Sequence, residues 1–117
     1  MLKTALIAAL LLLTGCATTL EQAKDTEPHK FASKNGPQEA VTCIARQAEA
    51  FSGVFFGRVE PSGQTGGWRG IVRHNESGVS VVAEAMPTSQ GSSITLWLSR
   101  QHFMLRDMLI KKITAGC

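Results

Sequence analysis

Most signatures of enzyme chemistry are missing from this chain of 117 residues. It lacks the Gly-x-Ser-x-Gly turn of serine hydrolases and the closing Gly-Lys-Ser/Thr of a phosphate-binding loop. It also lacks the Cys-x-x-Cys and His-x-x-x-His spacings that indicate a metal site. From residue 37 onward its acidic side chains are scattered singly, so the fold alone would have to assemble a carboxylate pair for glycoside hydrolysis. We therefore expect a protein that is not an enzyme and has no cofactor or metal.

The excess of positive charge is small. The chain has 12 Lys and Arg against 9 Asp and Glu, a formal net charge of +3 at pH 7. A general nucleic-acid binder concentrates much more basic charge on one face. We therefore expect no nucleic-acid partner.

No apolar run is long enough to cross a membrane. The nine residues from Ala5 to Leu13 would cover about 14 Å as a helix, roughly half of a bilayer's hydrocarbon core. A short apolar run behind one cation, here Lys3, is typical of an export signal.

Residues 13–16, Leu-Thr-Gly-Cys, end this segment. They resemble the bacterial lipobox, and the chain is similar to small lipoproteins of proteobacteria and prophages, a likeness that names no activity. The resemblance implies cleavage before Cys16, covalent lipid on its sulfur and a membrane as partner. By resemblance to the sorting of enterobacterial lipoproteins, Ala17 in place of Asp implies an outer-membrane lipoprotein facing the periplasm, with the inner membrane as the alternative. An ordinary secretory signal with a chance cysteine is the competing interpretation.

The composition divides the chain into three parts. Residues 1–15 are the predicted lipoprotein signal peptide. Residues 16–36 hold the lipidated cysteine and a polar stretch that we interpret as a flexible tether, because it has little apolar surface to offset chain entropy. Residues 37–117 form the predicted folded domain.

The domain is predicted to be α+β, with a four-stranded antiparallel meander and an N-terminal and a C-terminal helix packed on one face. A helix should begin at Pro37 and end before Gly53, since apolar side chains recur at spacings of three and four. The connections between strands have four to seven residues, too few for a parallel crossover. A second helix should run from Gln101 to about Ala115. The predicted strands are Val54 to Glu60, Trp68 to His74, Val79 to Met86, and Ser92 to Leu98. The second helix should turn inward Phe103 or Met104, Leu105, Met108, Leu109 and Ile113.

Two further cysteines, Cys43 and Cys117, are expected to pair. An exported protein meets an oxidising environment, and a bridge between them would tie the chain end to the first helix. The alternatives are a metal site shared with His74 and His102, and free or intermolecular thiols.

Strand alternation assigns side chains to the two faces of the sheet. One face, including Val79, should pack on the helices, and the other mixes apolar side chains with arginines. Such a mixture is enriched where proteins meet partners. A dimer interface and an ordinary solvated sheet are the alternatives. The predicted partner face consists of Phe56, Arg58, Arg69, Ile71, Arg73, Val82 and Trp97.

Together these patterns predict a non-enzymatic, lipid-anchored cell-envelope protein that docks a protein or cell-wall partner in the periplasm. The alternative is an exclusion or inhibitory lipoprotein that blocks phage or plasmid entry or a lysozyme. Periplasmic lysozyme inhibitors are similar in size, anchor and disulfide use, but they are mainly β, whereas this chain has no Tyr and two predicted helices. A hydrolase acting on the wall is the least favoured function.

Overall fold

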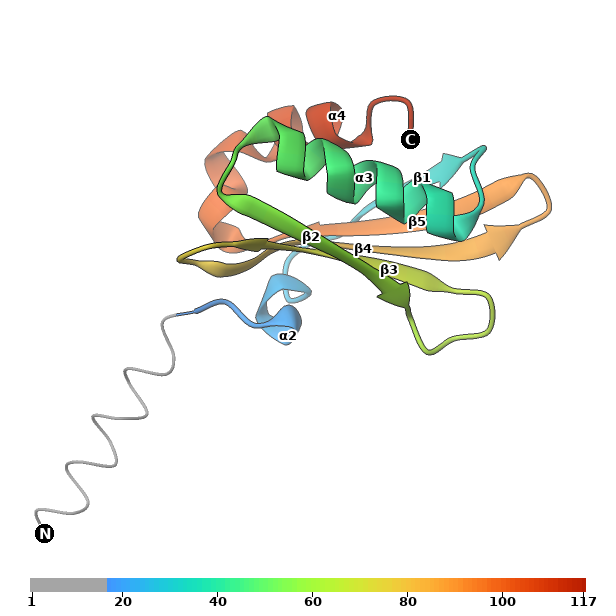
Figure 1. The fold of residues 1–117 in the computed structure, drawn as a ribbon, viewed down its shortest axis with the longest axis horizontal. Helices are drawn as coiled ribbons and strands as arrows, with labels where there is room; N and C mark the ends of the chain where they lie inside the picture. The colour runs from blue at the N-terminus through green and yellow to red at the C-terminus, as the bar shows by residue number, and fades with distance from the viewer. Residues whose placement is uncertain (1–16) are drawn as a thin grey trace, which may run out of the picture.

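The computed structural model describes residues 17–117, and the predicted signal peptide and Cys16 lie outside that range. Its central feature is an antiparallel sheet with the strand order β1-β5-β4-β3-β2 and with helices on both faces (Figure 1). The helices are α2 (Leu20–Ala23), α3 (Pro37–Phe51), the 3-10 helix η1 (Arg100–Leu105) and α4 (Arg106–Thr114). The strands are β1 (His29–Ser33), β2 (Phe55–Pro61), β3 (Trp68–His74), β4 (Gly78–Thr88) and β5 (Gly91–Leu98).

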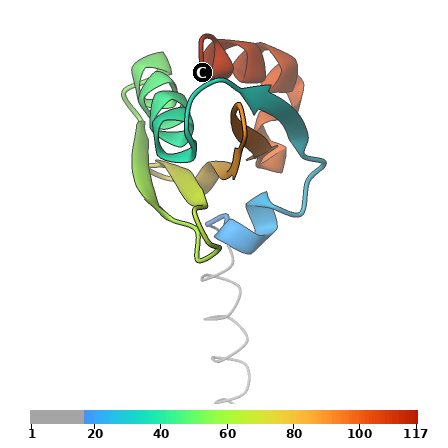
Figure 2. The same ribbon diagram turned by 90° about the vertical axis from the view of Figure 1, so that its right-hand side faces the viewer.

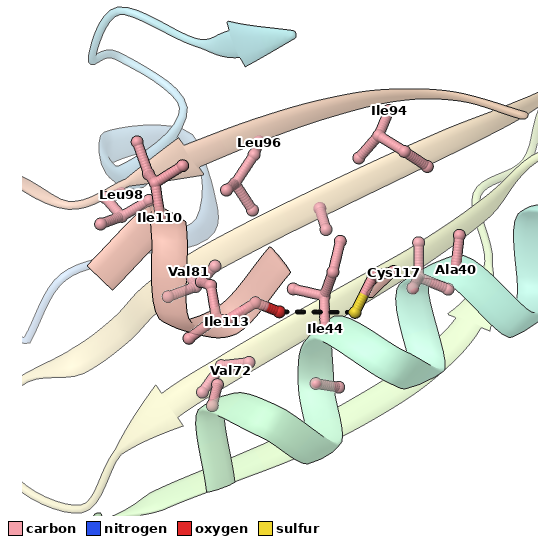
Figure 3. Packing of buried hydrophobic residues seen from close by; sticks show 14 of the residues in the cluster. Ala40, Ile44, Val72, Val81, Ile94, Leu96, Leu98, Ile110, Ile113 and Cys117 are labelled. Atoms are coloured by element: carbon pink, nitrogen blue, oxygen red, sulfur yellow. Dashed lines mark hydrogen bonds between the residues drawn. The ribbon is translucent and has the colours of Figure 1, made fainter. Parts of the chain in front are cut away.

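The α+β class and the placement of the two expected helices on one face are confirmed. α3 and α4 lie side by side above the sheet and bury their apolar stripes against it (Figures 1 and 3). α3 comes close to β2 and β3 because two glycines face it. A Cβ on Gly70 would lie 3.3 Å from the Val41 carbonyl oxygen, and one on Gly57 would lie 3.0 Å from the Ala45 Cβ. These two glycines thus let α3 pack closely on the sheet. The core under the helices consists mainly of the residues that the sequence assigns to it.

The predicted number of strands is wrong, because the sheet has five. The additional strand, β1, comes from the segment that we interpreted as a flexible tether. It pairs antiparallel with β5, from His29 opposite Leu96 to Ser33 opposite Ser92. Its Phe31 packs against the core. The polar stretch before residue 37 thus forms part of the folded domain.

A second part of the expected tether, α2, covers the opposite face of the sheet (Figure 2). A capping box starts it: the Thr19 hydroxyl accepts from the Gln22 backbone N–H, and the Gln22 side chain accepts from the Thr19 backbone N–H. Ala23 is fully buried in a small cluster with residues of β3 and β4. A four-residue helix is too short to be stable alone, so packing on the sheet holds it in place.

The register between β3 and β4 shifts by one residue. Val72 lies opposite Val81, whereas the next residue, Arg73, lies opposite Val79. The extra residue on β4 reverses the alternation of side chains before it. Val79 therefore packs on the α2 side of the sheet, which corrects its predicted place under α3 and α4.

The C-terminal helix also differs from the prediction. Its first part is the 3-10 helix η1, and only Arg106–Thr114 is α-helical. The change from about 3.0 to 3.6 residues per turn shifts the inward-facing phase. Leu109 and Ile113 are buried as predicted, and Ile110 joins them. Neither candidate for the first inward position, Phe103 or Met104, is buried, and Leu105 and Met108, which were also predicted to face inward, are exposed.

Cys43 on α3 and Cys117 lie at the distance of a disulfide bond, with their sulfur atoms 2.11 Å apart and their Cα atoms 5.7 Å apart. The amide of Gln47 donates to the Ala115 carbonyl oxygen at 2.7 Å. The bridge thus joins Cys117, three residues after the end of α4, to the middle of α3, which is the pairing that the sequence predicts. Among residues 17–117, no helix is long and apolar enough to cross a membrane.

Candidate functional site

The predicted partner face divides into a covered part and an open part. Ile71 and Val82 are 3% and 0% exposed, because α2 lies over them. Trp97 is half-buried at the edge of α2, and the Lys24 ammonium lies 4.8 Å from its ring centroid. These three residues are therefore covered by the chain's own N-terminal segment, which corrects the prediction that they form an open surface.

Backbone pairing holds the covering segment in place. The Thr18 N–H donates to the Ser77 carbonyl oxygen at 2.9 Å, and the Val79 N–H donates to the Thr18 carbonyl oxygen at 2.8 Å. On the far side of α2, the Thr26 hydroxyl donates to the Leu98 carbonyl oxygen at 2.8 Å. The segment from Thr18 to Thr26 is thus attached to the sheet at both ends.

A charged contact strengthens this attachment. The Lys24 ammonium lies 2.6 Å from a carboxylate oxygen of Glu84 on β4. Both side chains are partly buried, at 34% and 23% exposure, and the ammonium also lies over Trp97. Lys24 therefore fastens α2 to the sheet rather than serving as a free surface cation.

Three members of the predicted face remain open and adjacent. We call Phe56, Arg58 and Arg73 the open strip. Phe56 is 59% exposed and lies directly opposite Arg73 in the β2–β3 pair. Arg58 lies two residues along β2, on the same face of the sheet. The open strip thus places an exposed aromatic residue next to two arginines, one across the strand pair and one along β2.

The arginines of this face differ in their ion pairing. Glu60 accepts from Arg69 at 3.2 Å and lies 3.5 Å from a guanidinium nitrogen of Arg58. Arg69 is partly buried and belongs to this internal pair rather than to an open surface. In the part of the chain that the structure describes, Arg73 has no carboxylate within salt-bridge distance. Among the arginines of this face, Arg73 is therefore the one most available to an anionic group of a partner.

Two histidines flank one aromatic ring where β2 begins. The Phe55 ring centroid lies 5.6 Å from that of His74 and 5.8 Å from that of His102. Burial and the neighbouring His74 lower the pKa of His102 below its ordinary value. Among residues 17–117, no group of three or more His, Cys, Asp and Glu side chains could hold a metal ion.

Sequence reasoning missed a second surface, on η1 and the start of α4. Met104 is 97% exposed and Phe103 is 64% exposed. We call Phe103, Met104, Leu105 and Met108 the apolar patch. It borders a shallow hollow of about 340 Å³, whose other lining residues are Glu27, Arg106 and Asp107. Three consecutive large apolar residues, 103–105, cannot all face inward on one helix. This run was the feature of the sequence from which an exposed apolar surface could have been predicted.

No known protein family, curated protein or solved structure with which the chain was compared matches it. The functional argument therefore depends on the lipobox-like motif and on the two surfaces described above.

Proposed function

We propose that this protein is a non-enzymatic, lipid-anchored component of the bacterial cell envelope that docks a partner on the open strip. The observation that carries the proposal is the Leu-Thr-Gly-Cys motif at residues 13–16, which lies directly before the folded domain. Acyl chains on Cys16 would fix the domain to a membrane, since two or more chains give stable attachment.

The paired cysteines support an exported location. A disulfide persists in oxidising compartments such as the periplasm and is rare in the cytosol. The bridge between Cys43 and Cys117 joins α3 to the segment that follows α4 in a small domain, where it has a structural use. The pairing and the lipobox-like motif therefore point to the same compartment.

The anchor would stand close to the domain. Cys16 precedes Thr18 by two residues, a span of at most about 7 Å, and Thr18 is hydrogen-bonded to the turn between β3 and β4. The domain would therefore rest at the lipid surface instead of standing away from it on a tether of twenty residues. The domain would therefore meet its partner at the membrane surface.

The open strip suggests the chemistry of that partner. Arginine and aromatic side chains are enriched at the centres of protein interfaces, and a guanidinium binds a carboxylate through paired hydrogen bonds. We infer a protein or cell-wall component that presents a carboxylate beside an apolar surface. Arg73 would bind the carboxylate, and the Phe56 ring would cover the apolar part.

Metabolic labelling tests the anchor. Cells that express the full chain are grown with radioactive palmitate, and the protein is isolated from the envelope. We expect labelling of the parent and none of the Cys16→Ser variant. Equal radioactivity in the two proteins would remove the anchor and with it the proposed function.

Crosslinking in cells tests the open strip. A photoreactive benzoyl-phenylalanine replaces Phe56, and the adducts are identified by mass spectrometry. We expect one recurrent partner, whose capture is lost when Arg73→Ser is added. Lys111→Ser is the matched control, because it removes an exposed cation from α4 and should leave capture unchanged. Capture that is insensitive to Arg73→Ser would reject the open strip, and recovery of a second copy of this chain would assign the strip to a homodimer.

A further inference from the structure

The apolar patch and the point where the proposed anchor joins the domain lie at the same end of the sheet. This end contains the turn between β3 and β4, and η1 follows β5 there (Figure 1). Thr18 pairs with that turn through its backbone, and the Ser99 N–H donates to the Ser80 carbonyl oxygen at 2.9 Å. The start of the described chain and the start of η1 are therefore both attached to the first residues of β4.

A shared hollow confirms that the two segments are neighbours. Thr18, Arg100 and Gln101 line the same surface depression, with a volume of about 350 Å³. Phe103 follows Arg100 by one turn of the 3-10 helix, an advance of roughly 6 Å. The patch thus begins within one helical turn of a residue that lies beside Thr18.

The apolar patch consists of four large side chains that are all exposed. Phe103, Met104 and Leu105 are 64%, 97% and 50% exposed, and Met108 is 43% exposed. Contiguous exposed apolar side chains mark surfaces that meet a partner or a membrane. No segment among the described residues covers these side chains.

We propose that the apolar patch inserts into the lipid surface to which Cys16 is anchored. This inference rests on the proposed function, because the anchor selects the occupant. A lipidated Cys16 lies within about 7 Å of Thr18, so this end of the sheet cannot leave the bilayer. Aromatic and flexible apolar side chains at such a position enter the boundary between headgroups and acyl chains.

The charges beside the patch indicate which lipids are needed. Arg100 and Arg106 lie on η1 and at its end, whereas Glu27 and Asp107 line the same hollow as the patch. Cations and carboxylates therefore balance around it. The contact should depend on buried apolar area rather than on anionic headgroups, and zwitterionic lipid should be sufficient.

Photocrosslinking in vesicles tests this inference. The mature lipidated protein, which begins at Cys16, is reconstituted into phosphatidylcholine vesicles, with benzoyl-phenylalanine in place of Met104, whose 97% exposure makes the replacement tolerable. The matched control carries the probe at Gln64, an exposed residue in the loop at the opposite end of β2 and β3. We expect a phospholipid adduct at position 104 and none at position 64. Adding phosphatidylglycerol should leave the yield at position 104 unchanged.

Three outcomes separate the inference from the proposed function. If palmitate labels Cys16 but position 104 forms no lipid adduct, the inference is overturned and the anchor stands. A protein adduct at position 104 in intact cells, with no lipid adduct, would also overturn it and assign the patch to a protein partner. In a third experiment the probe replaces Leu105, and Phe103→Ser and Met104→Ser are added. A lipid adduct that persists in this variant would show that proximity to the bilayer, without insertion of the patch, produces the signal, and it would overturn the inference.

Discussion

Single residues decide where the N-terminal segment can join the sheet. Gly91 begins β5 with φ of +145°, and a Cβ there would lie 2.1 Å from the Ser33 carbonyl oxygen. Only glycine fits this position, because both the backbone conformation and the space exclude a side chain. Ser33, the last residue of β1, thus lies so close to the β4–β5 hairpin that a side chain at position 91 would collide with it.

Gly91→Ala should lower the free energy of unfolding by about 1 to 3 kcal/mol, through strain at a positive φ and displacement of β1. Urea denaturation measures the change. Gly53→Ala is the control, since nothing lies within 4 Å of its added Cβ; it should alter the stability by less than about 0.5 kcal/mol. Equal effects of the two substitutions would contradict the close approach of β1.

His102 should make the domain less stable in acid. Burial and the positive charge of His74 disfavour its imidazolium form, so its pKa in the folded state lies below the ordinary 6.5. The unfolded chain then binds the proton at higher pH than the folded one. The free energy of unfolding is not reduced by His102 above about pH 6.5. It falls as the pH drops from 6.5 towards the lowered pKa of His102, and it levels off below that pKa.

Denaturation as a function of pH measures this loss, and His102→Gln should flatten the curve between pH 6.5 and the lowered value. His29→Gln, which removes a histidine from β1, is the control and should retain the slope. If His102→Gln leaves the slope unchanged, another group is responsible.

At the scale of elements, the sequence predicts α3 and strands β2 to β5 nearly to the residue. The predicted helix from Pro37 ends at Phe51 in the structure, and the strand predicted from Trp68 to His74 is identical. Each of these elements carries its own apolar periodicity and is bounded by turn residues. Their identity therefore depends on local sequence.

The strand β1 and the docking of α2 on the sheet could not be predicted with the same reasoning. The β1 sequence, His-Lys-Phe-Ala-Ser, has one large apolar residue, and its strand state comes from pairing with the edge of β5. The capping box of α2 is readable in the sequence, but its docking site is not. That site includes Val79, which faces α2 only because β4 contains an extra residue.

The same limit applies to the candidate site. Alternation along β2 and β3 places Phe56, Arg58 and Arg73 on the outer face, where the structure has them. The covering of Ile71 and Val82 depends on α2, a tertiary contact that alternation does not contain. The sequence thus predicts the face of a side chain more readily than what covers it.

Ala23→Asp should detach α2 from the sheet. Ala23 is fully buried, and an unpaired carboxylate there would lower stability by about 1 to 3 kcal/mol. Iodide quenching of Trp97 fluorescence, measured in a Trp68→Phe background, should increase as the ring becomes exposed. Glu21→Ala, at an exposed position of the same helix, should leave quenching unchanged. Unchanged quenching in Ala23→Asp would mean that α2 does not shield Trp97.

At the scale of the whole molecule, one covalent bond links α3 to the segment that follows α4. The disulfide closes a loop with a sequence separation of 74 residues. In the chain-entropy model such a loop is worth about 4 kcal/mol, a large fraction of the stability of a domain of this size.

Cys43→Ser with Cys117→Ser should therefore lower the free energy of unfolding by about 4 kcal/mol, measured by chemical denaturation. Reducing agent should destabilise the parent by a similar amount and should have no further effect on the double variant. A double variant as stable as the parent would show that noncovalent packing of α3 on α4 is sufficient.

The pairing of β1 with β5 also bears on the order in which the protein folds. Strands β2 to β5 are joined by short connections and can zip together one hairpin after another, whereas residues 29–33 must wait for residues 92–96. The first strand in the chain should thus be the last to dock. In pulse-labelling hydrogen exchange, the amides of β1 should become protected after those of β3 and β4. Until then, the unpaired edge of β5 is open to other chains, which makes the interval before β1 arrives the period of greatest exposure to aggregation.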